Sequence, residues 1–186
     1  YDVSVLERGV QATVLLNNQG VATARDLRAF GITINNVDTV NVVVEDGSAV
    51  INTLVGADID ALVFSSSNSI TISPTAVLTV GTADTAAIDA AGINVIDASD
   101  VVGTFAVSLA ASGATQNLNF AAAEGATTVT LTSAFTFDAA TVFSDATTTG
   151  AFTIVTGGAT DFQKANIAGV DAIKLSTGDN VTLTWA

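Results

Sequence analysis

Short strand-like segments recur along the whole chain and constrain its fold more than any other feature of the sequence. They are β-branched and aromatic, mostly alternate with Thr or Ser, and are separated by Gly, Asn, Asp and Ser. This pattern is typical of an all-β protein. The expected strands are residues 3–6, 10–16, 32–34, 40–44, 61–64, 70–72, 77–80, 105–109, 129–131, 135–137, 152–155, 173–175 and 181–185.

Two stretches depart from this alternation and are expected to be short helical inserts. They are Val21 to Phe30 (VATARDLRAF) and Ala83 to Ala91 (ADTAAIDAA). Gly31 and Gly92 follow them directly, and a glycine in this position suits the end of a helix. An isoleucine-led segment follows each glycine, so we expect a strand to resume there.

The sequence also contains an internal repeat. The phrase Ile-x-x-Val-Asp-x-(Val/Ile)-x-(Val/Leu) fits residues 34–42 and 167–175, and a partial copy at 93–101 keeps Ile93, Ile96, Asp97 and Val101. The apolar residues of each copy are expected to point inward along a bent strand, with the Asp turned outward at the bend. The expected inward residues of the two full copies are Val37, Val40, Val42, Val170, Ile173 and Leu175.

Stacked units of this kind bury a continuous apolar seam that no single unit could bury alone. The predicted fold is therefore a β-solenoid-like stack of degenerate repeats with short helical inserts, at roughly 20–25 residues and a rise of about 4.8 Å per turn. A Greek-key β-sandwich is the alternative, because short strands also suit it. The length of 186 residues predicts one domain over residues 1–186, with a subdivision near residues 81–103 as the alternative.

Acidic residues dominate the charge of the chain. Eighteen Asp and Glu against five Lys and Arg give a net charge of −13, and the stretch from Ala29 to Gln163 has no positive side chain. Nucleic acid is therefore excluded as an expected partner, because phosphate binding needs clustered cations. Divalent cations are candidates to screen this charge, and solubility or life in high salt is the alternative explanation.

Catalytic side chains are scarce. The chain has no Cys, Met or His, which removes thiolate nucleophiles, soft metal ligands and the usual imidazole base. Asp97 and Asp100 are a carboxylate pair of the kind that glycosidases use, but such sites normally add cations or several aromatic residues. The expectation is that the protein is not an enzyme.

Carboxylates in the predicted turns are the candidate ligands for calcium, which needs six to eight oxygen ligands. The alternative is that they are solvated turn residues, because Asp is favoured in turns for its backbone hydrogen bonds alone. The candidates are Glu45, Asp46, Asp58, Asp60, Asp97, Asp100 and Asp179.

The phrases INNVDTVNVVV and IAGVDAIKLSTGDNVTLT, in a cysteine-free background rich in Ala, Thr, Gly, Asn and Asp, resemble repeats of bacterial surface-layer proteins and type I-secreted adhesins. The stretch ADTAAIDAAGINVIDASD is similar to the Ala-rich insert of related surface proteins. The resemblance implies a stacked β-fold, an extracellular location, calcium-dependent assembly and a role in a lattice or in adhesion. The glycine-rich calcium-binding nonapeptide of that family is absent, and Gly157-Gly158 is the only double glycine.

Two functions follow as expectations. One is a non-catalytic, secreted structural subunit that polymerises with copies of itself into a surface layer, sheath or matrix filament. The alternative is a binding module of an adhesin, which recognises a surface polysaccharide or another cell surface. No run of about 20 apolar residues occurs, so no membrane span is expected. Because the first residue is Tyr1 and not Met, we expect a processed product or part of a longer protein.

Overall fold

The structure of the chain is a computed structural model. It describes residues 2–8, 11–17, 27–29, 32–33, 37–45, 47–51, 54–55, 59–72, 78–80, 93–111, 114–145, 147 and 149–183. All regular elements within these ranges are β-strands, so the predicted all-β class is confirmed. Each of the segments predicted to be strands overlaps a strand of the structure.

Two large sheets contain most of the strands. The first sheet has the order β1 (Asp2–Arg8), β2 (Gln11–Asn17), β5 (Thr39–Val44), β8 (Ala61–Ser66), β11 (Val95–Val101), β13 (Asn119–Ala121) and β16 (Val142–Ser144). The second sheet has the order β3 (Leu27–Ala29), β6 (Ala49–Ile51), β9 (Ile70–Ile72), β12 (Phe105–Ala111), β14 (Thr127–Leu131), β17 (Phe152–Thr156) and β19 (Ala172–Leu175). β10 (Leu78–Val80) also pairs with β12.

Two small sheets complete the set of described strands. A third sheet consists of β15 (Phe135–Thr136), β18 (Thr160–Asp161) and β20 (Val181–Thr182), and a fourth consists of β4 (Ile32–Thr33) and β7 (Leu54–Val55). The β1–β2 pair is antiparallel. The other pairs of named strands are parallel, which excludes the antiparallel Greek-key sandwich for the described residues.

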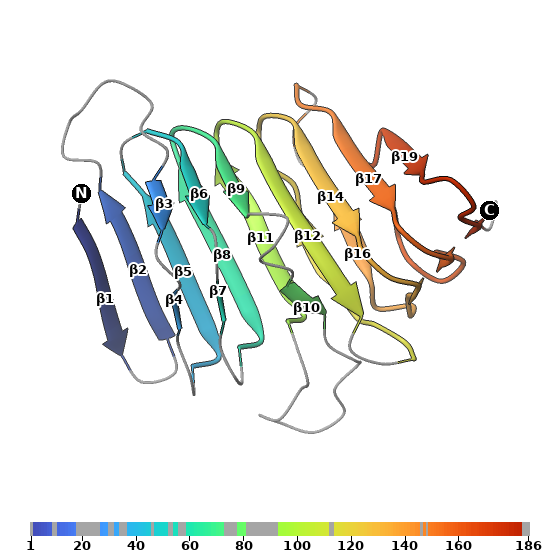
Figure 1. Ribbon diagram of the computed structural model, residues 1–186, viewed down its shortest axis with the longest axis horizontal. Helices are drawn as coiled ribbons and strands as arrows, with labels where there is room; N and C mark the ends of the chain where they lie inside the picture. The colour runs from blue at the N-terminus through green and yellow to red at the C-terminus, as the bar shows by residue number, and fades with distance from the viewer. Residues whose placement is uncertain are drawn as a thin grey trace.

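The chain visits the sheets in rotation. It passes from β5 in the first sheet to β6 in the second and β7 in the fourth, and then returns to the first sheet as β8. We call one such passage a round. Residues paired in register on neighbouring rounds lie 19 to 35 positions apart, and several hydrogen bonds between rounds join residues 22 to 25 positions apart. Successive rounds advance along the long axis, so the colours pass from blue at one end to red at the other (Figure 1).

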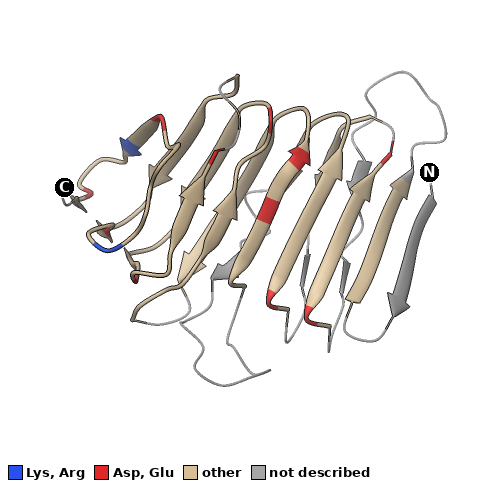
Figure 2. Cartoon of the chain, turned by 180° about the vertical axis from the view of Figure 1, so that it is seen from behind, with Lys and Arg blue, Asp and Glu red and all other residues tan. Residues whose placement is uncertain are grey.

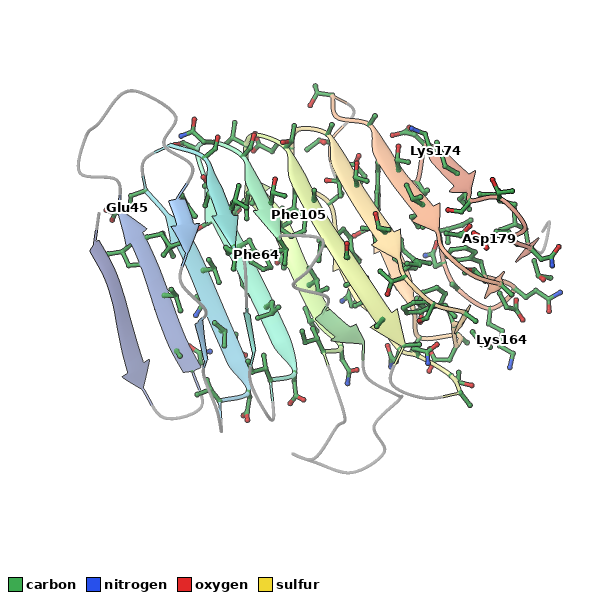
Figure 3. The ribbon with its side chains drawn as sticks, viewed as in Figure 1. Glu45, Phe64, Phe105, Lys164, Lys174 and Asp179 are labelled. Atoms are coloured by element: carbon green, nitrogen blue, oxygen red, sulfur yellow. The ribbon has the colours of Figure 1, made fainter. Side chains whose placement is uncertain are left out.

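Alternate residues of the long strands form the core. In β5 the residues Val40, Val42 and Val44 are buried while their neighbours are partly exposed, as the repeat predicted for Val40 and Val42. Aliphatic side chains fill the rounds up to β9, apart from Phe64, and phenylalanine rings dominate the later ones. The rings of Phe64 and Phe105 are 5.0 Å apart, and both lie between the two large sheets (Figure 3).

A ladder of phenylalanine rings continues from Phe105 toward the C-terminal end. Phe120 lies 5.4 Å from Phe152, and Phe143 lies 5.3 Å from Phe137 and 6.1 Å from Phe162. Ring pairs at these separations add attraction to the apolar area that they bury. Packing of these rings therefore stabilises the contact between successive late rounds.

Glycine allows neighbouring rounds to touch at the corner between the first and second sheets. A Cβ on Gly125 would lie 2.3 Å from the carbonyl oxygen of Gly103, and one on Gly150 would lie 2.2 Å from that of Gly125. Both separations are far below van der Waals contact, so only glycine fits this corner without displacing backbone. The phrases GTFAV, GATTV and GAFTI, which begin at these glycines, form a repeat that our sequence analysis did not recognise.

Several sequence predictions are wrong. The proposed helical insert Val21 to Phe30 contains a strand, β3, at Leu27–Ala29, because this segment pairs with β6. The second proposed insert, Ala83 to Ala91, lies outside the described residues. Leu175 was expected to point inward but is 55% exposed, because β19 is the last strand of its sheet.

The alignment of the repeat copies also needs correction. Backbone hydrogen bonds place Asp38 beside Asp60, and Asp60 beside Asn94, so Asn94 and not Asp97 is the counterpart of Asp38. The copy at 167–175 forms β19 in the second sheet, whereas the copy at 34–42 leads into β5 in the first. The matching phrases therefore mark similar strands at different places in the round.

Candidate functional site

Acidic side chains lie mainly near the strand ends. Figure 2 shows acidic segments along the edges of the large sheets and within one strand, β11, while the Lys and Arg colour appears only near the C-terminal end of the described residues. Of the seven calcium candidates, Asp46 and Asp58 lie outside the described residues. Of the remaining five, Glu45 and Asp100 line a common groove, and Asp60, Asp97 and Asp179 are not part of its lining.

Asp60 and Glu45 belong to opposite edges of the first sheet. Asp60 directly precedes β8, and its carbonyl oxygen accepts hydrogen bonds from the backbone N–H groups of Asn94 and Val95. Glu45 directly follows β5, where its backbone N–H donates to the carbonyl of Leu16 at 3.0 Å. Because β5 and β8 are parallel, the start of one strand and the end of the other lie at different edges of the sheet. Asp60 and Glu45 therefore do not share a site.

A β-bulge separates Asp97 from Asp100. Asp97 pairs with Val63 and Asp100 with Ser65, so β11 has one more residue than β8 over this interval. The Oδ1 atom of Asp97 accepts hydrogen bonds from the backbone N–H of Ser99 at 3.0 Å and from its hydroxyl at 2.7 Å. Asp97 thus binds a backbone N–H within the bulge, where the regular ladder is interrupted.

Glu45 and Asp100 line one shallow groove of about 370 Å³ at the edge where the first-sheet strands end. Its floor and walls include Ser65, Ser66, Ser67 and Val102, and Val102 is 52% exposed. The groove crosses the ends of β5, β8 and β11, which are neighbours in the sheet. It combines a mainly apolar lining with two acidic residues and three serines.

Asp179 lies far from this groove, in the last round. Figure 3 places Glu45 and Asp179 toward opposite ends of the molecule. The Oδ2 atom of Asp179 accepts hydrogen bonds from the Thr156 hydroxyl and the Ser176 backbone N–H, each at 3.2 Å. These bonds close the turn before β20, where Gly178 has a φ of +90°. Asp179 therefore stabilises a turn.

The same structural use of aspartate recurs elsewhere in the described part of the chain. Asp138, Asp145 and Asp161 each accept a hydrogen bond from the backbone N–H two residues later. This Asx-turn geometry is the usual reason for Asp at a turn. Among the residues that the structure describes, no three Asp or Glu side chains gather in a group suited to a metal ion.

Sequence reasoning named Glu45 and Asp100 but did not place them together, and it missed the three serines and Val102. The run Ser65-Ser66-Ser67 directly after the alternating segment Ala61 to Phe64 is the signal that was available. It marks a strand end with several hydroxyl groups.

Comparison of the chain with protein-family models, with curated proteins and with solved structures finds no match. Over the described ranges, the structure contains no helix of the length and apolar character needed to cross a membrane.

Proposed function

We propose that this chain is a non-catalytic structural subunit of an extracellular surface layer, sheath or matrix filament. The observation that carries the proposal is that the outermost described strands of the sheets have a described partner on one side only. Within the described residues, β1 and β3 lead the two large sheets at one end, and β19 and β20 finish the second and third sheets at the other. Among the strands that the structure describes, each of these has a partner on one side only, and an open edge is a template for a strand of another chain.

In this proposal the rounds form a β-solenoid. Three features support it: the rotation through the sheets, the parallel register between successive rounds, and the hydrogen bonds between residues 22 to 25 positions apart. In such a stack each round contacts only its neighbours, so further rounds from another copy extend it without a new kind of contact. This property suits a building block.

In the proposed assembly, calcium ions bridge or screen the acidic surfaces of neighbouring copies. A net charge of −13 repels like copies, and divalent cations reduce that repulsion. The ligands would come from exposed carboxylates of two chains, such as Glu45 and Asp100, rather than from a preformed cage in one chain.

Electron microscopy and light scattering of the purified protein test this function, first in millimolar calcium and then with a chelator. Ordered arrays or filaments that form with calcium and shorten with chelator are the expected result. A monodisperse monomer at every concentration in both conditions would contradict the structural role. Turnover of an acidic polysaccharide would contradict a non-catalytic role.

A second candidate function is that of an adhesin module that binds glycans. The groove at Glu45, Ser66 and Asp100 favours it, because carboxylates and hydroxyls accept and donate hydrogen bonds to sugar hydroxyls. A glycan array probed with the wild-type chain and with Asp100→Ala distinguishes the two functions. Binding that Asp100→Ala removes from an otherwise monomeric protein would favour the adhesin.

A further inference from the structure

The last round leaves part of its apolar surface uncovered. Of the large hydrophobic side chains in the described residues, three are exposed: Val102, Leu175 and Leu183, at 52%, 55% and 41%. Leu175 ends β19 and Leu183 directly follows β20, so two of the three belong to the C-terminal end of the stack. Ile173 and Val181 in the same strands are only partly buried.

The strands of this end are also open on one side. β19 pairs with β17, and β20 pairs with β18, and neither has a second partner among the described strands. We call the surface formed by β19, β20 and Leu183 the C-terminal end face. It combines strands that have one partner each among the described strands with two exposed leucines, and a further strand from another chain would pair with the first and cover the second.

The net negative charge is confined to the middle of the sequence. Residues 1–28 contain three arginines and three acidic residues, and residues 164–186 contain two lysines and two aspartates. Both segments are therefore neutral, and the whole net charge of −13 falls within residues 29–163. The rounds follow one another along the long axis, so the described strands of the two neutral segments, β1 and β2 on one side and β19 and β20 on the other, lie at the two ends (Figure 1). The described acidic residues of 29–163 lie between these ends, and we call the surface between the ends the flank (Figure 2).

Charged residues also occur at the C-terminal end. Asp171 directly precedes β19 and is exposed, and its Oδ2 atom accepts a hydrogen bond from the backbone N–H of Phe152. Lys174 is exposed on β19, toward the same end of the molecule as Asp179 (Figure 3). The C-terminal end thus carries residues of both signs of charge.

We propose, resting on the structural function above, that copies of this chain join head to tail. The C-terminal end face of one copy packs on the N-terminal end of the next, where β1 and β3 present their open edges. The contact is heterologous, because different surfaces of the two copies meet, and repetition of such a contact gives an open filament. Side-by-side contact brings two flanks of the same negative sign together and is disfavoured until salt or calcium screens them.

The substitution Leu175→Glu tests this contact, and Thr128→Glu is its control. Both residues are exposed, and both changes add one negative charge, but Thr128 lies on the flank in β14, outside the groove of Glu45 and Asp100. Each variant and the wild type are measured by sedimentation velocity and negative-stain electron microscopy at low ionic strength. Thermal unfolding followed by circular dichroism checks that both variants fold.

The wild type and Thr128→Glu are expected to form thin rods of one-chain width that lengthen with concentration. Leu175→Glu is expected to weaken the association at least about tenfold, because a charge is placed in an apolar contact. Assembly that both variants weaken equally, or that Leu175→Glu leaves unchanged, overturns the head-to-tail contact while leaving the structural function intact. Absence of any wild-type assembly, with and without calcium, overturns both.

A rod wider than one chain at low ionic strength also overturns the proposal, because it shows that the acidic flanks associate without screening. Wide bundles that form only at about 0.5 M salt agree with it, since the Debye length is then well below 10 Å.

Discussion

Glycine at the corner between the first and second sheets is required by contact between backbones. Gly103, Gly125 and Gly150 stand one above another, and a methyl group on any of them would meet the preceding round at 2.2 to 2.5 Å. Their φ values do not explain the choice, because the described glycines with positive φ are Gly47, Gly169 and Gly178. The requirement is therefore one of space.

Substitution Gly125→Ala is expected to lower the free energy of unfolding by about 3 kcal/mol, because two rounds must move apart to admit the methyl group. The neighbouring change Ala126→Ser is the control, since Ala126 is exposed and a hydroxyl there should change stability by less than about 0.5 kcal/mol. Urea denaturation followed by circular dichroism measures both. Equal midpoints for the two variants would show that the corner relaxes freely.

Aspartate at the turns acts through its hydrogen bonds. The Oδ1 atom of Asp138 accepts from the backbone N–H groups of Ala140 and Thr141 at 2.9 and 3.1 Å, and from the Thr141 hydroxyl at 3.3 Å. Asp100, by contrast, is exposed on the acidic flank. Substitutions at Asp138 and Asp100 therefore separate the effect of the hydrogen bonds on stability from the effect of the charge.

Asp138→Ala is expected to lower the unfolding free energy by about 1 kcal/mol, and Asp138→Asn by less, because the amide oxygen still accepts bonds. Asp100→Asn removes the same charge and should leave stability unchanged or slightly higher, since it reduces repulsion on the flank. Denaturation midpoints in low salt compare the three variants. If Asp138→Ala instead raised the unfolding free energy, removal of the negative charge would outweigh loss of the turn hydrogen bonds at this residue.

The strands that sequence could identify are those whose side chains carry a strong local signal. Val40, Val42 and Val44 in β5 alternate with smaller or polar neighbours, and the structure buries them as the alternation indicates. β13 (Asn119–Ala121) and β18 (Thr160–Asp161) carry no such signal and are strands because in-register neighbours hold them. Pairing of this kind depends on distant segments, so local propensity does not predict it.

The candidate site was less predictable than the strands. Glu45 and Asp100 meet in one groove because β5, β8 and β11 are neighbours. The step from β5 to β8 pairs Thr39 with Ala61, whereas the step from β8 to β11 pairs Ala61 with Val95 and spans a longer stretch of chain. This uneven spacing hid the correspondence of Asp38, Asp60 and Asn94, and with it the proximity of the two acidic residues.

The bulge in β11 leads to a prediction about deletions. Ser99 is an extra residue on the exposed side, and Ala98 and Val101 on either side of Ser99 and Asp100 are buried. Removal of Ser99 restores regular alternation, with Asp97 and Asp100 outward and Ala98 and Val101 inward. We expect this deletion to cost no more than about 1 kcal/mol, chiefly from the lost hydrogen bonds to Asp97.

Deletion of Thr130 from β14 is the control, because β14 pairs without a bulge. It would turn Leu131 outward and Thr132 inward, and a one-residue slip of this kind exchanges the two faces of a strand. We expect a loss of more than about 4 kcal/mol or no folding at all. Thermal melts of the two deletions provide the comparison, and similar losses would contradict the assigned register.

At the scale of the whole molecule, stability should vary along the stack. Strands in the middle pair with a neighbour on each side, as β14 pairs with β12 and β17, whereas β19 pairs with β17 alone among the described strands. The late rounds also lose burial progressively, since Phe152 and Ile154 are fully buried while Ile173 and Leu175 are not. In a stack of this kind the terminal units open first.

Hydrogen exchange of the dilute protein is therefore expected to be at least about tenfold faster for the amides of β19 than for those of β14. As the protein concentration rises, the head-to-tail contact should cover β19 and slow its exchange, while β14 is unaffected because its partners are already in place. The same measurement on Leu175→Glu should show fast exchange of β19 at all concentrations. Equal exchange rates of β19 and β14 in the dilute wild type would contradict this prediction. They would show that the strands open together in one cooperative step, and binding of a second copy could not then protect β19 selectively.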